Sequence, residues 1–284
     1  MHSENVHSEN VHSGETIQNI SAWDRLARAG HVLATPATDG ELRDPLKVLD
    51  EIGWLGKSIR GLRVLCLAAG GGRHGPLYCA AGAMVTVVDL SPEMLKLDRQ
   101  VAFERKMDIR LIESDMCNLR SLQDGEFDLV VHPVSTCYVS QISEVFQEVA
   151  RVLRVGGLYI SQHKQPVNLQ ASLLPIDGKY VIERPAKTGG IAEPSIQASR
   201  LREPGTREVI HSLQTILGGI CRAGFVIEDF AEPQHGKVEQ PLGTFGHRCA
   251  FIPPYIRVKS RRVSKDTRPN QNDFIEVNKL WIGY

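Results

Sequence analysis

Residues 62–92 read LRVLCLAAGGGRHGPLYCAAGAMVTVVDLSP, and this stretch decides the fold of the chain. Residues 64–67 form a short apolar run without a helical period, which is typical of a strand buried on both faces. Three consecutive glycines, 70–72, indicate a sharp turn or a close approach of the main chain to a ligand. A helical segment and a second apolar run follow, and the run ends at Asp89. This order predicts a nucleotide-binding βαβ unit in which the acid meets ribose hydroxyls.

The composition is that of an ordinary globular protein, with 284 residues, 42% of them apolar and 23% charged. The formal net charge is zero, so overall charge does not draw the chain to nucleic acid or to an anionic membrane. No apolar run approaches the roughly 20 residues of a membrane span, and the N-terminus lacks the plan of a secretory signal. The six cysteines are scattered without a CxxC pair, which indicates reduced thiols, no metal site and a cytoplasmic protein.

The chain divides into four parts. Residues 1–13 repeat the unit HSENV, and residues 1–15 are expected to form a disordered tail. Residues 16–61 have a mostly helical pattern, which predicts an N-terminal leader packed over the core sheet. Residues 62–262 predict one Rossmann-like α/β domain, and residues 263–284 form a polar C-terminal tail.

Strands alternate with helices in the central domain, which predicts a parallel sheet with right-handed crossovers. The expected strands are 64–67, 84–88, 109–112, 127–131, 158–161, 225–230 and 254–263. Amphipathic patterns predict helices at 142–152 and 209–222. Residues 162–204 interrupt this order and are rich in Pro, Gly, Lys and Gln. Because loops of this length in compact domains are often functional, we expect this insertion to form a substrate cap.

Two cofactors fit the glycine turn. Gly70, Gly72 and Gly75 match the GxGxxG spacing of nicotinamide-dependent dehydrogenases, and S-adenosylmethionine would use the same physical parts. The dehydrogenase alternative lacks a catalytic set. Tyr255 and Lys259 have the YxxxK spacing of one reductase family, but they lie in the last predicted strand, far along the chain from the expected place.

Four segments, in order, resemble the class I S-adenosylmethionine-dependent methyltransferases. They are VLCLAAGGG, VTVVDLSPEML, ESDM, and FDLVVHP followed by EVARVLRVGGLYI. The last is the most specific, because a helix ending in RVLRVGG and leading straight into an apolar strand has no counterpart in dehydrogenases. The resemblance covers about residues 62–162, and more loosely Trp23 and residues 209–262, and looks closest to an uncharacterised bacterial branch. It implies a Rossmann-like three-layer sandwich, a mostly parallel seven-stranded sheet with an antiparallel last strand, and methyl transfer.

The resemblance also implies a set of cofactor-binding residues. Asp89 would bind the ribose hydroxyls, and Asp115 would accept a hydrogen bond from the adenine amino group. Two positions depart from the family, since Cys66 stands where an acid is usual and Ala68 where a glycine is usual. The full expected set is Ala68, Gly70, Gly72, Asp89, Leu90, Asp115, Met116 and His132.

Methyl transfer requires alignment of acceptor, methyl and sulfur, and in some cases removal of a proton. Ligands of open parallel sheets lie beyond the carboxyl ends of the strands, where His132 and His163 follow the fourth and fifth strands. His132 is the candidate catalytic base, because an imidazole titrates near neutral pH. A substrate clamp and a structural loop histidine are the alternatives for this residue. Ser135, Tyr138 and His163 are expected to line the acceptor pocket.

A small molecule is the expected acceptor, because the insertion has a mixed rather than a basic composition. The sequence leaves the acceptor atom and the oligomeric state unspecified. Three alternative functions remain: an NAD(P)-binding oxidoreductase, a non-catalytic S-adenosylmethionine-binding protein and a nucleic-acid methyltransferase. The basic residues of 257–268 favour the last alternative, although a solvated strand end explains them more simply.

Overall fold

The structure, a computed structural model, describes residues 14–186, 189–192 and 203–264. The expected tails at 1–15 and 263–284 lie largely outside these ranges. Gly14 already begins the first helix, so residues 14 and 15 do not belong to a tail. No helix within the described ranges combines the length and the apolar character needed to cross a membrane.

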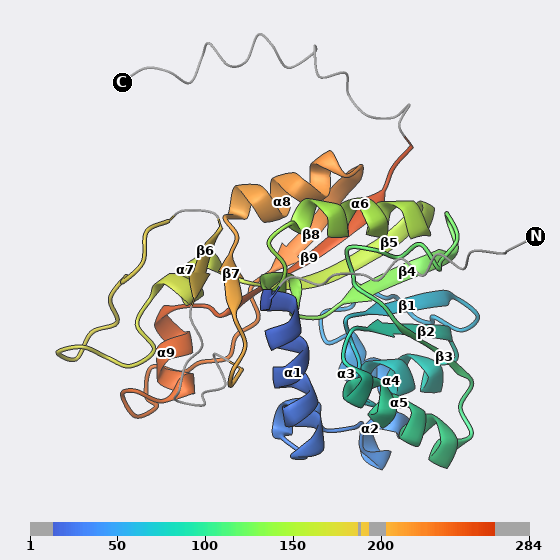
Figure 1. Ribbon diagram of the computed structural model, residues 1–284, viewed down its shortest axis with the longest axis horizontal. Coiled ribbons are helices and arrows are strands. Elements are labelled where there is room, and N and C mark those ends of the chain that lie inside the picture. Colours follow the sequence, from blue (N-terminus) through green and yellow to red (C-terminus); the bar gives the residue numbers. More distant parts are fainter. Residues whose placement is uncertain (1–13, 187–188, 193–202, 265–284) are drawn as a thin grey trace, which may run out of the picture.

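A seven-stranded sheet forms the centre of the molecule, with the order β3-β2-β1-β4-β5-β9-β8 (Figure 1). Its strands are β1 (Arg63–Leu67), β2 (Met84–Asp89), β3 (Ile109–Glu113), β4 (Phe127–His132), β5 (Leu153–Lys164), β8 (Phe225–Ala231) and β9 (Tyr255–Arg262). The first five strands pair in parallel, whereas β9 runs antiparallel to both of its neighbours. The predicted mostly parallel, seven-stranded Rossmann-like sheet with an antiparallel last strand is therefore confirmed, and this last strand lies inside the sheet, between β5 and β8.

Helices cover both faces of the sheet, as Figure 1 shows. One face carries α6 (Ile142–Val152) and α8 (Leu213–Arg222), and the other carries α3 (Pro45–Leu49), α4 (His74–Ala80) and α5 (Pro92–Arg105). Each face has its own apolar core. Phe146 and Tyr159 belong to the first core, and Val64 and Val87 belong to the second. These two cores fix the strands whose carboxyl ends build the candidate site.

The N-terminal leader consists of three helical pieces and a short 3-10 turn. They are α1 (Gly14–Arg28), the turn η1 (Val32–Ala34), α2 (Asp39–Arg43) and α3. Helix α1 contacts α5 and the turn η2 (Thr136–Tyr138), which follows β4. The leader therefore closes over the end of the sheet at which β4 terminates.

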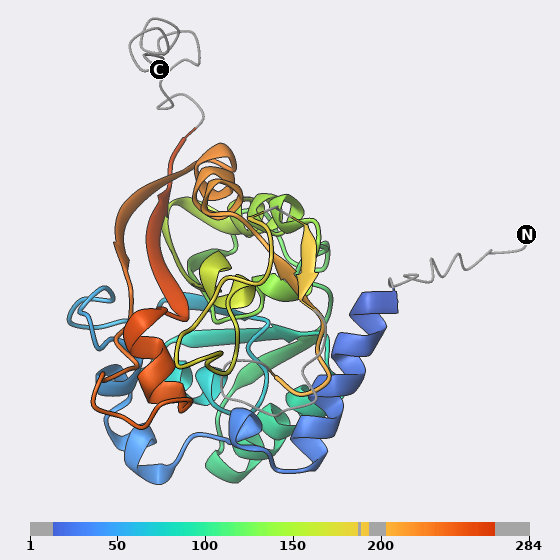
Figure 2. The same ribbon diagram turned by 90° about the vertical axis from the view of Figure 1, so that its left-hand side faces the viewer.

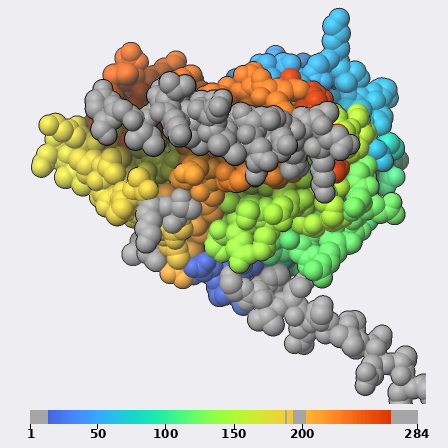
Figure 3. Space-filling view, turned by 90° about the horizontal axis from the view of Figure 1, so that it is seen from above, coloured from blue at the N-terminus to red at the C-terminus, as the bar shows by residue number. Residues whose placement is uncertain are grey.

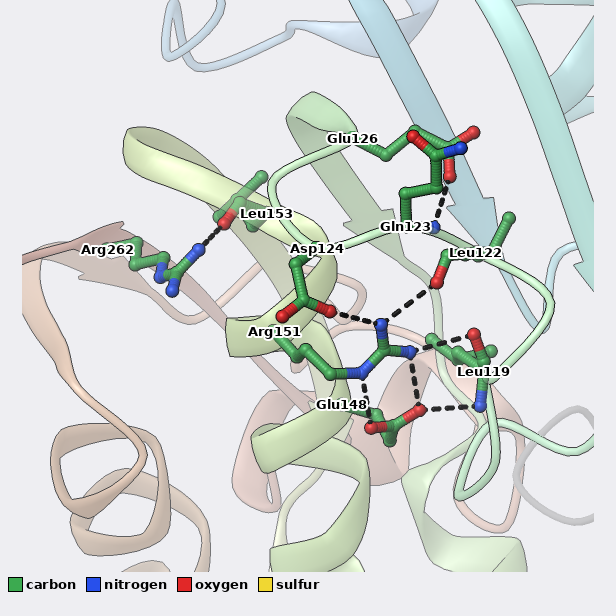
Figure 4. Close-up of polar contacts among 9 residues, drawn as sticks. All are labelled: Leu119, Leu122, Gln123, Asp124, Glu126, Glu148, Arg151, Leu153 and Arg262. Carbon is green, nitrogen blue, oxygen red and sulfur yellow. Dashed lines mark hydrogen bonds and ion pairs between the residues drawn. The ribbon is translucent and has the colours of Figure 1, made fainter.

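The helix-to-strand junction gives a physical reason for the RVLRVGG segment (Figure 4). Arg151 Nε donates to Glu148 Oε1 at 2.8 Å, and Nη1 donates to the Leu122 carbonyl at 2.9 Å and to Asp124 Oδ1 at 2.8 Å. Nη2 donates to the Leu119 carbonyl at 2.8 Å and to Glu148 Oε2 at 2.9 Å. The guanidinium thus joins helix α6 to the loop that precedes β4.

The rest of the segment fixes β5 against its neighbours. Arg154 Nε donates to Asp128 Oδ1 on β4 at 2.6 Å. Arg262, at the end of β9, donates to the Leu153 carbonyl (Figure 4). A Cβ atom on Gly157 would lie 2.8 Å from the Arg154 carbonyl oxygen, so only glycine fits there. The most specific part of the resemblance is therefore structural, and it acts by placing β4 and β5.

The structure corrects two boundaries expected from the sequence. Strand β5 begins at Leu153 and not at residue 158, because it pairs with Phe127 before a register shift in β4. The helix expected at 209–222 begins only at Leu213. Residues 208–210 instead form strand β7, which pairs antiparallel with β6 (Gly190–Ala192).

A second layer of chain lies beside the sheet and comes from two distant segments. The first contains α7 (Pro166–Gln170), β6 and β7, and the second contains α9 (Phe245–Phe251), which lies between β8 and β9. We call the described residues of 165–212 and 232–254 the cap (Figures 1 and 2). The chain after α7, yellow in Figure 3, forms one end of the molecule. The insertion expected at 162–204 starts inside β5, which runs to Lys164, and the cap also takes in residues 205–212 and 232–254.

Arg248 joins the two segments of the cap. Its side chain is fully buried. Nε donates to the Ser172 carbonyl at 2.8 Å, Nη1 to Asn168 Oδ1 at 2.5 Å and Nη2 to the carbonyls of Asn168 and Ala171 at 3.0 and 3.3 Å. Because buried polar groups need partners, these bonds hold α9 onto the end of α7.

Candidate functional site

A cavity of about 720 Å³ lies at the carboxyl ends of the central strands. Its walls come from α1, the leader around α3, the glycine turn after β1, the ends of β2, β4 and β5, and the start of β9. The strand order reverses between β1 and β4, and ligands of open α/β sheets bind at such a switch point. The volume is within the range of roughly 300–1,000 Å³ that small-molecule sites occupy.

The cavity brings together most of the residues expected from the sequence. Gly72 and His163 are the exceptions. Gly72 has a φ of +72°, and a Cβ atom there would lie 3.1 Å from the Leu97 carbonyl oxygen, so this glycine serves packing against α5. The predicted residues that line the cavity are Ala68, Gly70, Asp89, Leu90, Asp115, Met116, His132, Ser135 and Tyr138.

Asp89 holds the glycine turn while its side chain lines the cavity. Its Oδ2 accepts a hydrogen bond from the Gly70 N–H at 2.8 Å, and its Oδ1 accepts one from the Ser91 N–H at 2.9 Å. Burial raises the pKa of Asp89, and these backbone donors oppose that effect. A Cβ atom on Gly70 would lie 2.9 Å from Met94 Cβ and 3.0 Å from Asp89 Oδ2. The turn is therefore pressed against the carboxylate, and only glycine allows this contact.

Asp98 is a carboxyl group beneath the turn that the sequence reasoning missed. It projects from α5, is fully buried, and accepts a hydrogen bond from the Gly71 N–H at 2.8 Å through Oδ2. Burial raises its pKa to about 7. Asp98 interacts electrostatically with Cys66, whose pKa is raised by burial and then by Asp98. A carboxyl group thus reaches the turn from α5, although β1 carries a cysteine where an acid was expected.

The sequence does contain a signal for Asp98. It lies three residues from Leu95 and three from Val101, both buried, so it occupies the apolar face of its helix. A charged residue on such a face needs a specific partner.

His132 lines the cavity but is engaged through both of its ring nitrogens. Nδ1 lies 2.9 Å from Tyr159 Oη, and Nε2 lies 2.6 Å from Ser135 Oγ. Burial lowers the pKa of His132 to about 3, so the ring is neutral near neutral pH. The imidazole therefore links a buried phenol to a hydroxyl on the cavity wall.

His163 lies in the core between the sheet and α6, and not at the cavity as expected. Its Nε2 is 2.8 Å from Ser161 Oγ and its Nδ1 is 2.8 Å from Thr136 Oγ1. Its ring packs edge-on against Phe146, with 6.1 Å between the ring centroids. Burial lowers the pKa of His163 to about 3. The reason for the misplacement is the strand period, which turns this residue toward the helix.

Four aromatic side chains that the expected set did not include also line the cavity. Trp23 of α1 packs edge-on against Tyr138, with 6.1 Å between the centroids. Trp54 is fixed by a hydrogen bond from Nε1 to Asp229 Oδ2 at 3.0 Å. Tyr78 and Tyr255 complete this aromatic wall. These residues come from four separate segments of the chain, so only the folded structure brings them together.

Two charged residues, Arg257 and Glu203, also line the cavity. Arg257 of β9 donates from Nε to Gln162 Oε1 at 2.6 Å. Glu203 of the cap accepts from the buried Lys164 Nζ at 2.6 Å, and Lys164 also contacts Glu208. Burial is the largest single influence on the pKa of Lys164 and lowers it, but Glu203 and the other neighbouring groups together raise that pKa above its ordinary value, so the ammonium stays charged. Within the described ranges, no group of three or more His, Cys, Asp or Glu side chains is arranged to hold a metal ion.

Comparison with known proteins agrees with this geometry. The family model described as "Methyltransferase domain" matches residues 65–161, from β1 into β5. The uncharacterized methyltransferase YbaJ of Bacillus subtilis is 35% identical over 196 residues, which are 66% of this chain and 75% of that protein. A ubiquinone biosynthesis O-methyltransferase of Xanthomonas oryzae pv. oryzae is 31% identical over 104 residues, which are 36% of this chain and 44% of that protein.

A solved structure shares the fold. The crystal structure of an S-adenosylmethionine dependent methyltransferase from Mesorhizobium loti matches with a TM-score of 0.58 and 23% identity, over 73% of this chain and 94% of that one. The sequence relatives and the matched domain, taken with the cavity beside the glycine turn, identify the family. The chain belongs to the S-adenosylmethionine-dependent methyltransferases.

Proposed function

We propose that this methyltransferase acts on a small, largely apolar molecule that binds beside the cofactor in the cavity. One observation carries the proposal. The same cavity is lined by the glycine turn with Asp89 and Asp115, and by aromatic side chains from α1, the leader, α4 and β9. Because an in-line displacement requires donor and acceptor to be held in contact, a shared enclosed volume is what the reaction needs.

The residues around the turn fit the cofactor, which supplies a methyl group activated on a sulfonium. Because Gly70 has no Cβ atom, the main chain of the turn can approach a ligand closely. Asp89 is assigned to the ribose hydroxyls and Asp115 to the adenine amino group, because carboxylates accept such bonds. Leu90 and Met116 supply apolar surface for the adenine ring.

We assign His132 to positioning and not to proton removal. Its pKa is lowered to about 3, and both ring nitrogens already have hydroxyl partners. A general base at neutral pH works best with a pKa near that pH. The ring instead holds the hydroxyl of Ser135, a residue that lines the cavity.

The charges of β9 weigh against a nucleic-acid acceptor. Lys259 lies 3.5 Å from Glu228, and Arg261 pairs with the same carboxylate. The basic run expected from the sequence is thus partly neutralised. The related ubiquinone biosynthesis protein is named for a small-molecule pathway, which agrees with this class. All six cysteines are free thiols, which suits the reducing conditions of the cytoplasm.

Calorimetric titration tests the cofactor half of the proposal. S-adenosylhomocysteine is expected to bind, and Asp89→Ala is expected to weaken it by about tenfold or more, the loss of a charge-assisted contact. Asp108→Asn, an exposed change away from the cavity, serves as the control. Binding of NADH without binding of S-adenosylhomocysteine would contradict the assignment.

Transfer of labelled methyl groups tests the acceptor half. The enzyme is incubated with methyl-labelled S-adenosylmethionine and either an ultrafiltered metabolite extract or total RNA and DNA. Label is expected in the small-molecule fraction. Label confined to nucleic acid, with steep loss at high salt, would reject a small acceptor.

A further inference from the structure

Among the described residues, Arg257 is one of two arginines that line the cavity, and the two differ in how far a neighbouring carboxylate compensates their charge. Arg73 forms a close pair with Glu41, with contacts of 2.6 and 3.0 Å. The hydrogen bond from Arg73 lowers the pKa of Glu41 to about 2. Among the described residues, the carboxylate paired with Arg257 within 4 Å is Glu51, at 3.8 Å, and the Glu51 side chain is 77% exposed. The charge of Arg257 is therefore the less compensated of the two.

The orientation of the Arg257 guanidinium is fixed. Arg257 and Gln162 are register partners on β9 and β5, and the 2.6 Å bond from Nε to Gln162 Oε1 holds the plane of the group. Nη2 has no hydrogen-bond partner within the part of the chain that the structure describes, and the side chain is 28% exposed. A fixed guanidinium with free N–H groups at a cavity is suited to bind a carboxylate or a phosphate.

Strand order places this group at the acceptor end. The sequence of strands from the cofactor acid to Arg257 is β2, β1, β4, β5, β9. With neighbouring strands about 4.8 Å apart, Arg257 is about 10 Å across the sheet from His132 on β4 and about 19 Å from Asp89 on β2. The strand that carries Arg257 is thus well separated from the strand that carries the ribose acid, and it is closer to the end of β4.

The neighbours of Arg257 add neutral donors and aromatic surface. Burial raises the pKa of Tyr78 and raises that of Tyr255 to about 12, so both phenols keep their protons. Burial, and then Arg257 itself, lowers the pKa of His235, which packs edge-on against Tyr255. The nearby Asp50 is already engaged, since its carboxylate accepts from the N–H groups of Trp54 and Leu55 at 2.5 and 2.9 Å.

We propose that Arg257 binds an anionic group of the acceptor, so that the acceptor is a flat, largely apolar molecule bearing a carboxylate or a phosphate. The proposal rests on the small-molecule acceptor proposed above and names its chemical class. A cationic acceptor at Glu203 is the rival. Glu203 already has a cation, because Lys164 lies 2.6 Å away in the buried wall, so the observations favour the anion.

Four phenyl compounds of different charge provide the test. Benzoate, phenyl phosphate, benzamide and benzylamine are added to the protein saturated with S-adenosylhomocysteine, and their dissociation constants follow from the concentration dependence of the melting temperature. Wild type, Arg257→Gln and Arg261→Gln are compared. Arg261 shares its strand face with Arg257 but pairs with Glu228 outside the cavity. Wild type and Arg261→Gln are expected to prefer both anions over benzamide by roughly tenfold or more, and Arg257→Gln to lose that preference.

Each outcome bears on the proposal. A larger gain from benzoate than from phenyl phosphate assigns a carboxylate, and the reverse assigns a phosphate. Tightest binding of benzylamine, equal binding of benzoate by Arg257→Gln and wild type, or no binding of any ring compound would overturn the proposal. A normal response of Arg257→Gln to S-adenosylhomocysteine shows that the variant is folded. Absence of that response in wild type would instead contradict the methyltransferase function itself.

Discussion

The backbone of Ala68 has a φ of +48°, in the left-handed region that glycine favours. Holding an alanine there costs about 1–2 kcal/mol of strain. Glycine would remove this strain, but the greater conformational entropy of its unfolded chain would offset part of the gain in stability. Ala68→Gly is therefore expected to raise the free energy of unfolding by up to about 1 kcal/mol, measured by urea denaturation. Ala69→Gly, at the adjacent buried position with an ordinary φ, should lower it. Loss of stability in both variants would argue against strain at Ala68.

Asp98 gives a prediction of pH dependence. Its native pKa is raised by burial to about 7, whereas the unfolded carboxyl titrates near about 4. Between these pH values the unfolded chain has lost the proton and the native protein keeps it. The free energy of unfolding is therefore expected to fall as pH rises from about 4 to about 7, by at most about 1.4 kcal/mol per pH unit from this group.

Comparison of variants isolates this group. Asp98→Asn removes the ionisation but keeps an oxygen that accepts from Gly71, so the difference in unfolding free energy between wild type and variant should change over that pH range. Asp108→Asn replaces an exposed carboxyl, and the difference in unfolding free energy between this variant and wild type should stay the same over that pH range. A constant difference between wild type and Asp98→Asn at every pH would show that the native carboxyl titrates at its ordinary pKa.

Sequence alone could predict the site residues that end a strand, because the carboxyl ends of parallel strands lie at the same edge of the sheet. Asp89 and His132 end β2 and β4, the two strands that flank β1, so the strand pattern places them at the cavity edge. Arg257 and Trp54 reach the same cavity from β9 and from the leader, and no local pattern connects those segments. His163 was misplaced because a strand end gives the position along the chain but leaves open the face to which the side chain turns.

At the level of elements, Arg151 concentrates several contacts in one side chain, since all three of its nitrogens donate hydrogen bonds. Arg151→Ala is expected to lower the free energy of unfolding by about 2–3 kcal/mol, because it frees Glu148 and two loop carbonyls together. Urea denaturation measures the change.

The control comes from the same motif. Arg154 is half exposed and reaches one carboxylate, Asp128, so Arg154→Ala should cost less than about 1 kcal/mol. Equal losses in the two variants would indicate that the junction depends on general charge and not on the bonds between α6 and the loop before β4.

Elements with a clear period and a cap were predicted well, whereas short buried ones were not. Ser91 accepts from the Met94 N–H at 3.2 Å and Pro92 begins α5, as the sequence suggests. The two apolar residues at 209–210 fit a helical period as well as a strand period. They form a strand because they pair with β6, which the local sequence does not reveal. Helix α9 was not predicted, because the position that it buries fully is Arg248 and not the apolar residue that would indicate a core-facing helix.

Over the whole molecule, α1 is the element that connects the sheet to the cap. Toward the cofactor end, Ser91 Oγ donates to Asp24 Oδ1 at 2.6 Å. Toward the cap, Asn19 Nδ2 donates to the Arg207 carbonyl at 3.1 Å, and its Oδ1 accepts from the Arg207 N–H at 2.8 Å. Trp23, between these two ends, lines the cavity. The enclosure of the cavity therefore depends on contacts that α1 makes in two directions.

If the contacts at the two ends of α1 are independent, a substitution at one end should speed hydrogen exchange only in the segment that this end contacts. Asn19→Ala removes two hydrogen bonds to Arg207 and is expected to speed amide hydrogen exchange about tenfold in residues 205–210, and Asp24→Ala to do the same in residues 91–95. Each variant is the control for the other, because each should leave the distant segment at its wild-type rate. Hydrogen exchange read by mass spectrometry measures both segments in one experiment. Faster exchange at both ends in either variant would mean that α1 docks as a single unit, and the cofactor and acceptor halves of the cavity would then open together.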